Sequence, residues 1–167
     1  MSNSSGTWIT IGTAVAVLVL TSAAARAEVS GQLVVDGKPI KIATAYAYAI
    51  QGTFDPKAQD VVVVLCDVPV PPAAQRDADA RIRVSKTGKL HCVEQTIEAD
   101  KSVNGFAVLH ERFEPFLRGS SSYQKFEAKT FDGKTIAGRA RTSRPESFEN
   151  VPYSYDITFS VPIAPLK

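Results

Sequence analysis

The side chains of this chain that are best suited to chemistry are two histidines and two cysteines. Cys66, His91, Cys92 and His110 carry the four ligand atoms of a Cys2His2 zinc site. Their spacing opposes such a site, because adjacent residues of a strand point to opposite faces, so His91 and Cys92 would not reach the same ion. We therefore expect no metal site and no cofactor.

The cysteines have a second possible use. If the chain is exported, as argued below, it folds in an oxidising compartment, where cysteines on neighbouring strands can join. Cys66 and Cys92 are thus the candidates for a disulfide, and the alternative is two buried thiols that pack as small apolar groups. A disulfide would exclude the zinc site. There is no C-x-x-C motif, which argues against a redox catalyst.

His110 is a candidate binding residue with two interpretations. It shares a strand face with Phe106 and Val108, which favours a hydrogen-bonded histidine at the margin of the core. At the open end of a sheet, beside Glu111 or Glu114, it would instead be a binding residue or a general base. The sequence leaves both open.

A row of basic residues forms a third candidate site. Arg139, Arg141 and Arg144 follow Lys134, and the first two arginines lie on one face of a strand. Outside the cytoplasm such a row would meet an anionic glycan, lipopolysaccharide or an acidic protein surface. The alternative is a solvated strand whose charges discourage edge-to-edge aggregation.

Motifs of well-known catalytic sites are missing from the sequence. It contains no nucleophile elbow, HExxH, P-loop, Rossmann glycine pattern or calcium loop. The serine run in Gly119-Ser-Ser-Ser122 lacks the G-x-S-x-G spacing and is typical of a loop. We assign no catalytic residue.

Residues 1–27 are typical of an export signal. Their apolar run is too short to span a bilayer stably, and Ala25 and Ala27 form an A-x-A cleavage site before Glu28. The first residues carry no Lys or Arg, so an uncleaved anchor is the alternative. The mature protein would be residues 28–167, periplasmic or secreted, with no stable membrane span.

The length and charge of the chain indicate the number of domains and one class of partner to exclude. Residues 28–167 have the usual length of a single domain. The chain has 19 Lys and Arg against 17 Asp and Glu, a formal net charge of +2. This balance gives no strong field to attract nucleic acid, so we expect no nucleic-acid partner.

Alternating apolar residues and frequent turn residues predict strands through most of residues 28–167. Asp36-Gly37, Asn104-Gly105 and Asp132-Gly133 are typical hairpin turns. Apolar residues at 74, 78 and 82 favour one short helix over residues 72–86. We therefore expect an all-β fold, an antiparallel β-sandwich of about eight strands with one short helix. The predicted strands cover residues 29–35, 40–50, 60–67, 89–97, 106–113, 123–131, 134–142 and 153–161.

Several short phrases resemble a widespread, uncharacterised group of exported bacterial proteins. The resemblance covers most of residues 30–160 and implies an exported β-sandwich, without implying an activity or a catalytic residue. It rests on Gly31-Gln-Leu-Val-Val-Asp-Gly-Lys38, Tyr46-Ala-Tyr-Ala49, Phe54-Asp-Pro56, Val61-Val-Val-Val-Leu65, Asp77-Ala-Asp-Ala-Arg81, Leu109-His110, Asp132-Gly133 and Ile136-Ala-Gly138.

These observations favour a non-catalytic binding or accessory protein of the bacterial envelope, whose partner is an envelope protein or an anionic glycan. The alternative is a small envelope hydrolase or metal-dependent enzyme centred on His110, with Glu111 and His91 beside it. Convergence of these side chains in one pocket would favour the enzyme.

Overall fold

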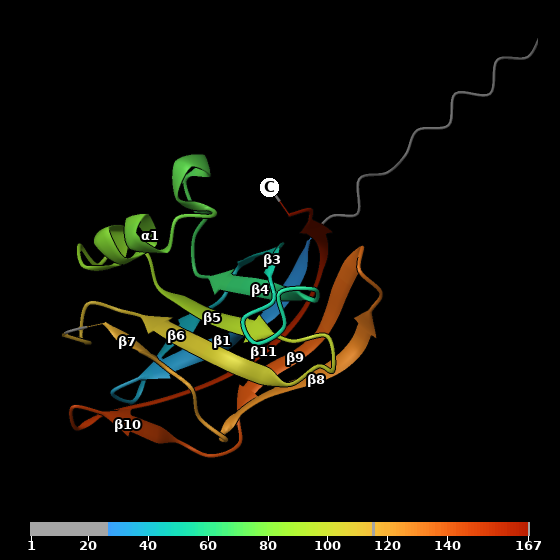
Figure 1. Cartoon of the computed structure of the whole chain (residues 1–167). Coiled ribbons are helices and arrows are strands. Elements are labelled where there is room, and N and C mark those ends of the chain that lie inside the picture. The colour runs from blue at the N-terminus through green and yellow to red at the C-terminus, as the bar shows by residue number, and fades with distance from the viewer. Residues whose placement is uncertain (1–26, 115, 167) are drawn as a thin grey trace, which may run out of the picture.

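The structure is a computed structural model that describes residues 27–114 and 116–166. The predicted export signal lies outside the described residues, apart from its last residue, Ala27. Within the described part, eleven strands form one sheet, accompanied by one α-helix and one short 3-10 helix (Figure 1). None of the helices in these ranges has the length and hydrophobicity needed to cross a membrane.

The strands follow the apolar alternation of the sequence. In the longest strand, buried residues such as Tyr155, Ile157 and Phe159 alternate with more exposed ones, as the two-residue period of a strand requires. The elements are β1 (Glu28–Val35), β2 (Lys38–Lys41), β3 (Thr44–Gln51), β4 (Gln59–Cys66), η1 (Pro72–Ala74), α1 (Ala78–Ser85), β5 (Cys92–Ile97), β6 (Val103–Leu109), β7 (Leu117–Gly119), β8 (Gln124–Phe131), β9 (Thr135–Thr142), β10 (Glu146–Phe148) and β11 (Val151–Ala164).

The fold is mostly β as predicted, but its sheet is curled and contains both parallel and antiparallel strand pairs. Its main path runs β2-β1-β11-β3-β4-β5-β6-β7, and β9 and β10 also pair with β11. At its end β11 pairs in parallel with β3, through Ile163 beside Ala47, while the other pairings are antiparallel. This parallel contact joins the two halves of the sheet, so the architecture is a half-barrel, and the predicted antiparallel sandwich of about eight strands is corrected accordingly.

Two hydrophobic clusters lie on opposite faces of the β4-β5-β6 half. The larger one fills the inside of the curl, where Val63, Leu65 and Val93 meet Tyr155 and Ile157 of β11. The smaller one lies outside, between this half of the sheet and the segment that carries η1 and α1. Figure 1 shows α1 outside the curled sheet.

Two of the three predicted hairpin turns are confirmed and the third is wrong. Asp36-Gly37 joins β1 to β2 with φ values of 52° and 73°, and Gly133 turns β8 into β9 with φ 79°. Asn104-Gly105, in contrast, lies inside β6. The turn before β6 lies earlier, at Lys101, which has φ 74°.

The predicted helix over residues 72–86 is divided. Asp77 accepts a hydrogen bond from the Ala80 N–H at 2.9 Å, so α1 starts there with an N-cap instead of continuing from η1. The buried residues of α1 are Arg81 and Ser85, so the predicted stripe of apolar residues does not describe its buried face.

Candidate functional site

Three neighbouring strands end at the same edge of the sheet and place polar side chains there. Asp67 follows β4, His91 precedes β5 and His110 follows β6. The register pairs Cys66 with Cys92, and Cys92 with Leu109. The next cross-strand row therefore contains Asp67, His91 and His110 side by side.

The disulfide lies directly behind this row. Cys66 and Cys92 are joined, with their Cα atoms 4.2 Å apart, which confirms them as a disulfide pair and excludes the Cys2His2 zinc site. The residues next to them, Asp67 and His91, are hydrogen-bonded to each other. The Asp67 N–H donates to the His91 carbonyl at 3.1 Å, and the His91 N–H donates to Asp67 Oδ1 at 2.9 Å. A disulfide is typical of proteins outside the cytoplasm.

His91 lies between two carboxylates. Its Nδ1 is 2.6 Å from Asp67 Oδ2 and its Nε2 is 2.8 Å from Glu111 Oε2. Burial disfavours the charged ring, but the hydrogen bonds to Asp67 and Glu111 outweigh burial and raise the pKa of His91. The ring is thus oriented from both sides, with 15% of its side-chain surface exposed.

His110 combines both of its predicted surroundings. Its ring packs against Phe113 at the margin of the main core, with centroids 6.0 Å apart, and its Nδ1 accepts a hydrogen bond from the Arg112 N–H at 3.0 Å. It also lies 4.7 Å from the His91 ring, centroid to centroid, and its Nδ1 is 3.5 Å from Glu111 Oε2. Burial, aided by the charges of His91 and Arg112, lowers the pKa of His110.

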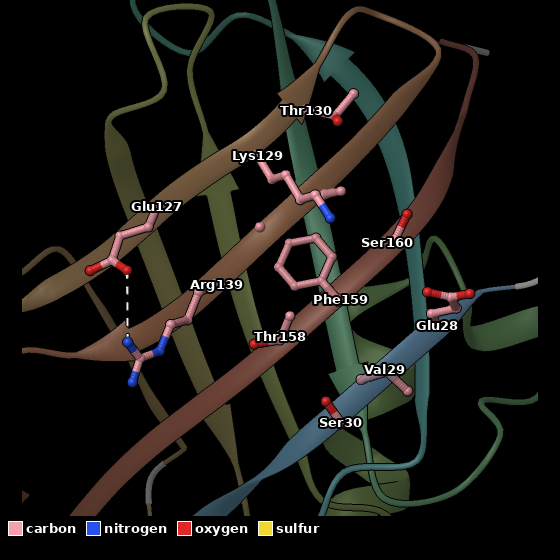
Figure 2. Close-up of a pocket in the computed structure, with 12 residues that line it drawn as sticks. Glu28, Val29, Ser30, Glu127, Lys129, Thr130, Arg139, Thr158, Phe159 and Ser160 are labelled. Atoms are coloured by element: carbon pink, nitrogen blue, oxygen red, sulfur yellow. Dashed lines mark ion pairs between the residues drawn. The ribbon is translucent and has the colours of Figure 1, made fainter.

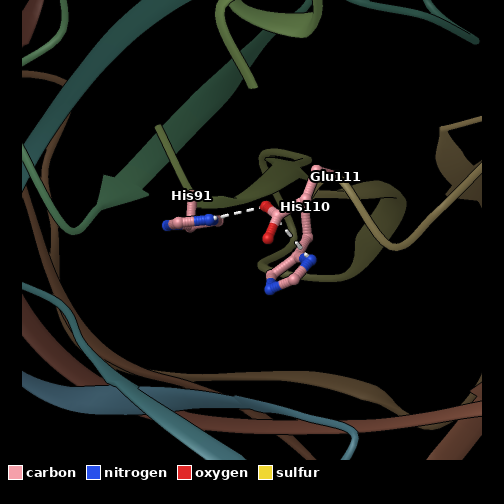
Figure 3. Close-up of side chains that lie close together, drawn as sticks. All are labelled: His91, His110 and Glu111. Atoms are coloured by element: carbon pink, nitrogen blue, oxygen red, sulfur yellow. Dashed lines mark hydrogen bonds and ion pairs between the residues drawn. The ribbon is translucent and has the colours of Figure 1, made fainter. Parts of the chain in front are cut away.

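Glu111 completes the group of converging side chains (Figure 3). Burial acts to raise its pKa, but hydrogen bonds from its own backbone and from His91 outweigh burial and lower it. With His91 and His110 it borders a cavity of about 280 Å³, together with Arg112 and residues of the β1–β2 hairpin. The cavity lets a small ligand approach all three ionisable side chains.

The predicted arginine row is present, but acidic side chains accompany it. Arg139 forms a bidentate pair with Asp156, and Arg141 donates to Glu127 Oε1 at 2.7 Å. Arg144 lies over the Tyr123 ring and 3.4 Å from a carboxylate oxygen of β10. The arginines therefore present little unbalanced positive charge to an anionic glycan.

A larger cavity lies on the other half of the sheet. It is a depression of about 610 Å³ across β1, β11, β9 and β8, lined mostly by polar and charged side chains such as Lys129, Arg139 and Thr158 (Figure 2). Glu127 and Arg139 are cross-strand neighbours on β8 and β9 at its edge, with a carboxylate oxygen 3.9 Å from the guanidinium. Neither histidine reaches this depression.

No role for Asp67 is predicted from the sequence, and apart from the rejected zinc site His91 is named only as a neighbour of His110 in the alternative enzyme function. Both residues are adjacent in sequence to the disulfide cysteines, Asp67 after Cys66 and His91 before Cys92. Assuming the disulfide and an antiparallel pair would have placed them opposite each other. The signal was therefore in the sequence.

Comparisons of this chain with protein-family models, with curated proteins and with solved structures found no match.

Proposed function

We propose that this chain is an exported, non-catalytic binding protein of the bacterial envelope, with its ligand site at the cavity bordered by His91, His110 and Glu111. One observation carries this proposal: three ionisable side chains from two segments of the chain, His91 before β5 and His110 with Glu111 after β6, converge on one cavity at the end of the sheet. Such convergence is typical of sites that orient a small ligand or a partner's side chain.

The cavity itself favours binding over covalent catalysis. Its lining comes from described residues that include no serine, threonine or cysteine, so no side-chain hydroxyl or thiol lies there to act as a nucleophile. Both ring nitrogens of His91 donate to carboxylates, which suits a fixed positive group.

Export and membership of the uncharacterised bacterial group are parts of the same proposal. The A-x-A pattern that ends at Ala27 supports export, and a structural disulfide is what an oxidising compartment permits.

The test is purification of the tagged mature protein, residues 28–167, from its own envelope under non-reducing conditions, followed by native mass spectrometry. We expect a retained ligand or partner that a His110→Ala variant no longer retains. The matched control is Glu114→Gln, which changes an exposed carboxylate paired with Lys86 outside the cavity. Equal retention by His110→Ala and by the unmodified protein would contradict the proposed site.

A second candidate function is an envelope hydrolase or metal-dependent enzyme centred on His110. The convergence of His91, His110 and Glu111 favours it, because an oriented imidazole beside a carboxylate is suited to proton transfer. Turnover of envelope substrates that is lost in His110→Ala would establish it. Absence of turnover in a folded protein that retains its ligand would leave the binding function.

A further inference from the structure

We propose that His91 Nε2, His110 Nδ1 and a carboxylate oxygen of Glu111 bind one divalent transition-metal ion of the zinc class. This inference rests on the proposed function for the place of the ligand site, and it adds the chemical class of the ligand. This proposal departs from the sequence prediction of no metal site; the one ligand set weighed for that prediction, Cys2His2, is removed by the Cys66–Cys92 disulfide.

The distances suit a tetrahedral ion. Zinc bonds to nitrogen and oxygen of about 2.0–2.2 Å place neighbouring ligand atoms of a tetrahedron roughly 3.4 Å apart. In the structure, His91 Nε2 lies 2.8 Å and His110 Nδ1 lies 3.5 Å from Glu111 Oε2, and one ligand atom from each of the three residues falls within 4.8 Å of the others. Small rotations of these side chains, with release to solvent of the proton that His91 Nε2 donates to Glu111, would therefore place all three atoms around one ion.

Asp67 prepares His91 as a ligand. Ligating histidines commonly donate their other ring N–H to a carboxylate, which fixes the tautomer and orients the ring. Asp67 Oδ2 lies 2.6 Å from His91 Nδ1, so it holds the proton on Nδ1 and directs Nε2 toward Glu111. The Asp67 carboxylate is itself positioned by the His91 backbone N–H at 2.9 Å.

His110 offers a lone pair on the correct nitrogen. The Arg112 N–H donates to His110 Nδ1 at 3.0 Å, which identifies Nδ1 as the acceptor nitrogen of the ring. This is the nitrogen that faces Glu111. A metal ion would replace one neutral hydrogen bond at this position.

The donor set determines the class of ion. Two imidazoles and one carboxylate suit Zn²⁺, Cu²⁺ or Ni²⁺, whereas Ca²⁺ and Mg²⁺ prefer oxygen ligands. Three protein ligands leave a fourth position, and the adjoining cavity of about 280 Å³ leaves room there for water or a partner's side chain. Glu111 is 43% exposed, so an ion can enter from this side.

The test is calorimetric titration of the oxidised protein, residues 28–167, with Zn²⁺ after removal of bound metal. We expect one Zn²⁺ per chain, no binding of Mg²⁺ under the same conditions, and a higher unfolding temperature with Zn²⁺ than without it. His91→Gln should weaken binding by about 100-fold or more, and Asp67→Asn by about 10- to 100-fold, because Asp67 acts through His91.

Glu114→Gln is the matched control, since this exposed carboxylate follows Glu111 by three residues but is not among the ligands, and the affinity of this variant for Zn²⁺ should equal that of the unmodified protein. No Zn²⁺ binding, or equal binding by His91→Gln and the unmodified protein, would overturn the metal site. If the protein from the envelope retains a ligand that depends on His110 and contains no metal, the metal site is overturned and the proposed binding function stands. If the protein binds Zn²⁺ but retains no such ligand or partner, the proposed binding function is overturned and the metal site stands.

Discussion

The ion pair between Arg81 of α1 and Glu94 of β5 provides the sharpest test of how the helical segment is held on the sheet. Arg81 is fully buried, and its Nε and Nη2 donate to the two carboxylate oxygens of Glu94 at 2.6 and 2.9 Å. Its Nη1 donates to the carbonyls of Ala74 and Gln75, both at 2.9 Å, at the end of η1. One guanidinium thus joins β5, η1 and α1.

The perturbation is Glu94→Gln, which keeps the volume of the side chain but removes its charge. The Arg81 guanidinium would then be buried without a counterion, and breaking a buried pair in this way costs about 3–5 kcal/mol. Because the neutral amide still accepts one hydrogen bond and Glu94 is 8% exposed, we expect a loss of about 3 kcal/mol in the free energy of unfolding.

The assay is urea unfolding of the oxidised protein, followed by circular dichroism and tyrosine fluorescence. The control is Arg83→Met, on the same helix. Arg83 is exposed, and its ion pair with Asp77, at 3.8 Å, is worth less than about 1 kcal/mol. A loss below about 1 kcal/mol in Glu94→Gln, or equal losses in both variants, would refute the view that this buried pair holds the helical segment.

Three further predictions concern the disulfide, the backbone and the histidines. Replacing Cys66 and Cys92 by Ser should lower the free energy of unfolding by about 3 kcal/mol, because the disulfide closes a loop with a sequence separation of 26, and a midpoint in urea that reductant does not move would contradict this. Gly31→Ala should cost about 2 kcal/mol by the same measurement, because Gly31 has φ +127° and a Cβ there would overlap a backbone carbonyl of β11; an unchanged midpoint would be inconsistent with this conformation. In NMR titrations of the metal-free protein, His91 should titrate above pH 6.5 and His110 below it, and the reverse order would refute the assigned surroundings. Since the folded-state pKa of His91 is raised, its contribution to stability should be full below about pH 6.5 and be lost as the pH rises through that pKa.

Much of the fold follows from local sequence patterns. The two-residue alternation locates most strands, and Asp36-Gly37 marks a hairpin because both residues adopt positive φ there. The curl of the sheet could not be predicted in this way. It depends on the parallel pairing of Ile163 with Ala47, two residues far apart in sequence whose contact leaves no local pattern.

Arg81 illustrates why helical patterns alone were insufficient. Its spacing from Asp77 is that of an exposed i, i+4 ion pair, but Asp77 caps the helix and Arg81 turns inward. The reason is Glu94, a charged residue buried on β5 that requires a counterion. Such a choice depends on a tertiary partner, which no pattern within the helix contains.

The disulfide and the candidate site form one structural unit, and this determines how the site should respond to loss of the disulfide. Cys66 and Cys92 fix the register of β4 against β5, and the next row places Asp67 against His91. The Asp67 N–H donates to the His91 carbonyl and the His91 N–H donates to Asp67 Oδ1, and these bonds close this end of the strand pair. Without the disulfide this end of the pair would open more readily, because loop ends have the lowest local stability. The orientation of the His91 ring would then loosen while the core around Val93 persists. Replacing both cysteines by Ser, which removes the disulfide without supplying thiol ligands, should therefore weaken Zn²⁺ binding at a urea concentration where the sheet remains folded. Loss of zinc affinity and of the fold at the same urea concentration would show that the disulfide stabilises the protein only globally.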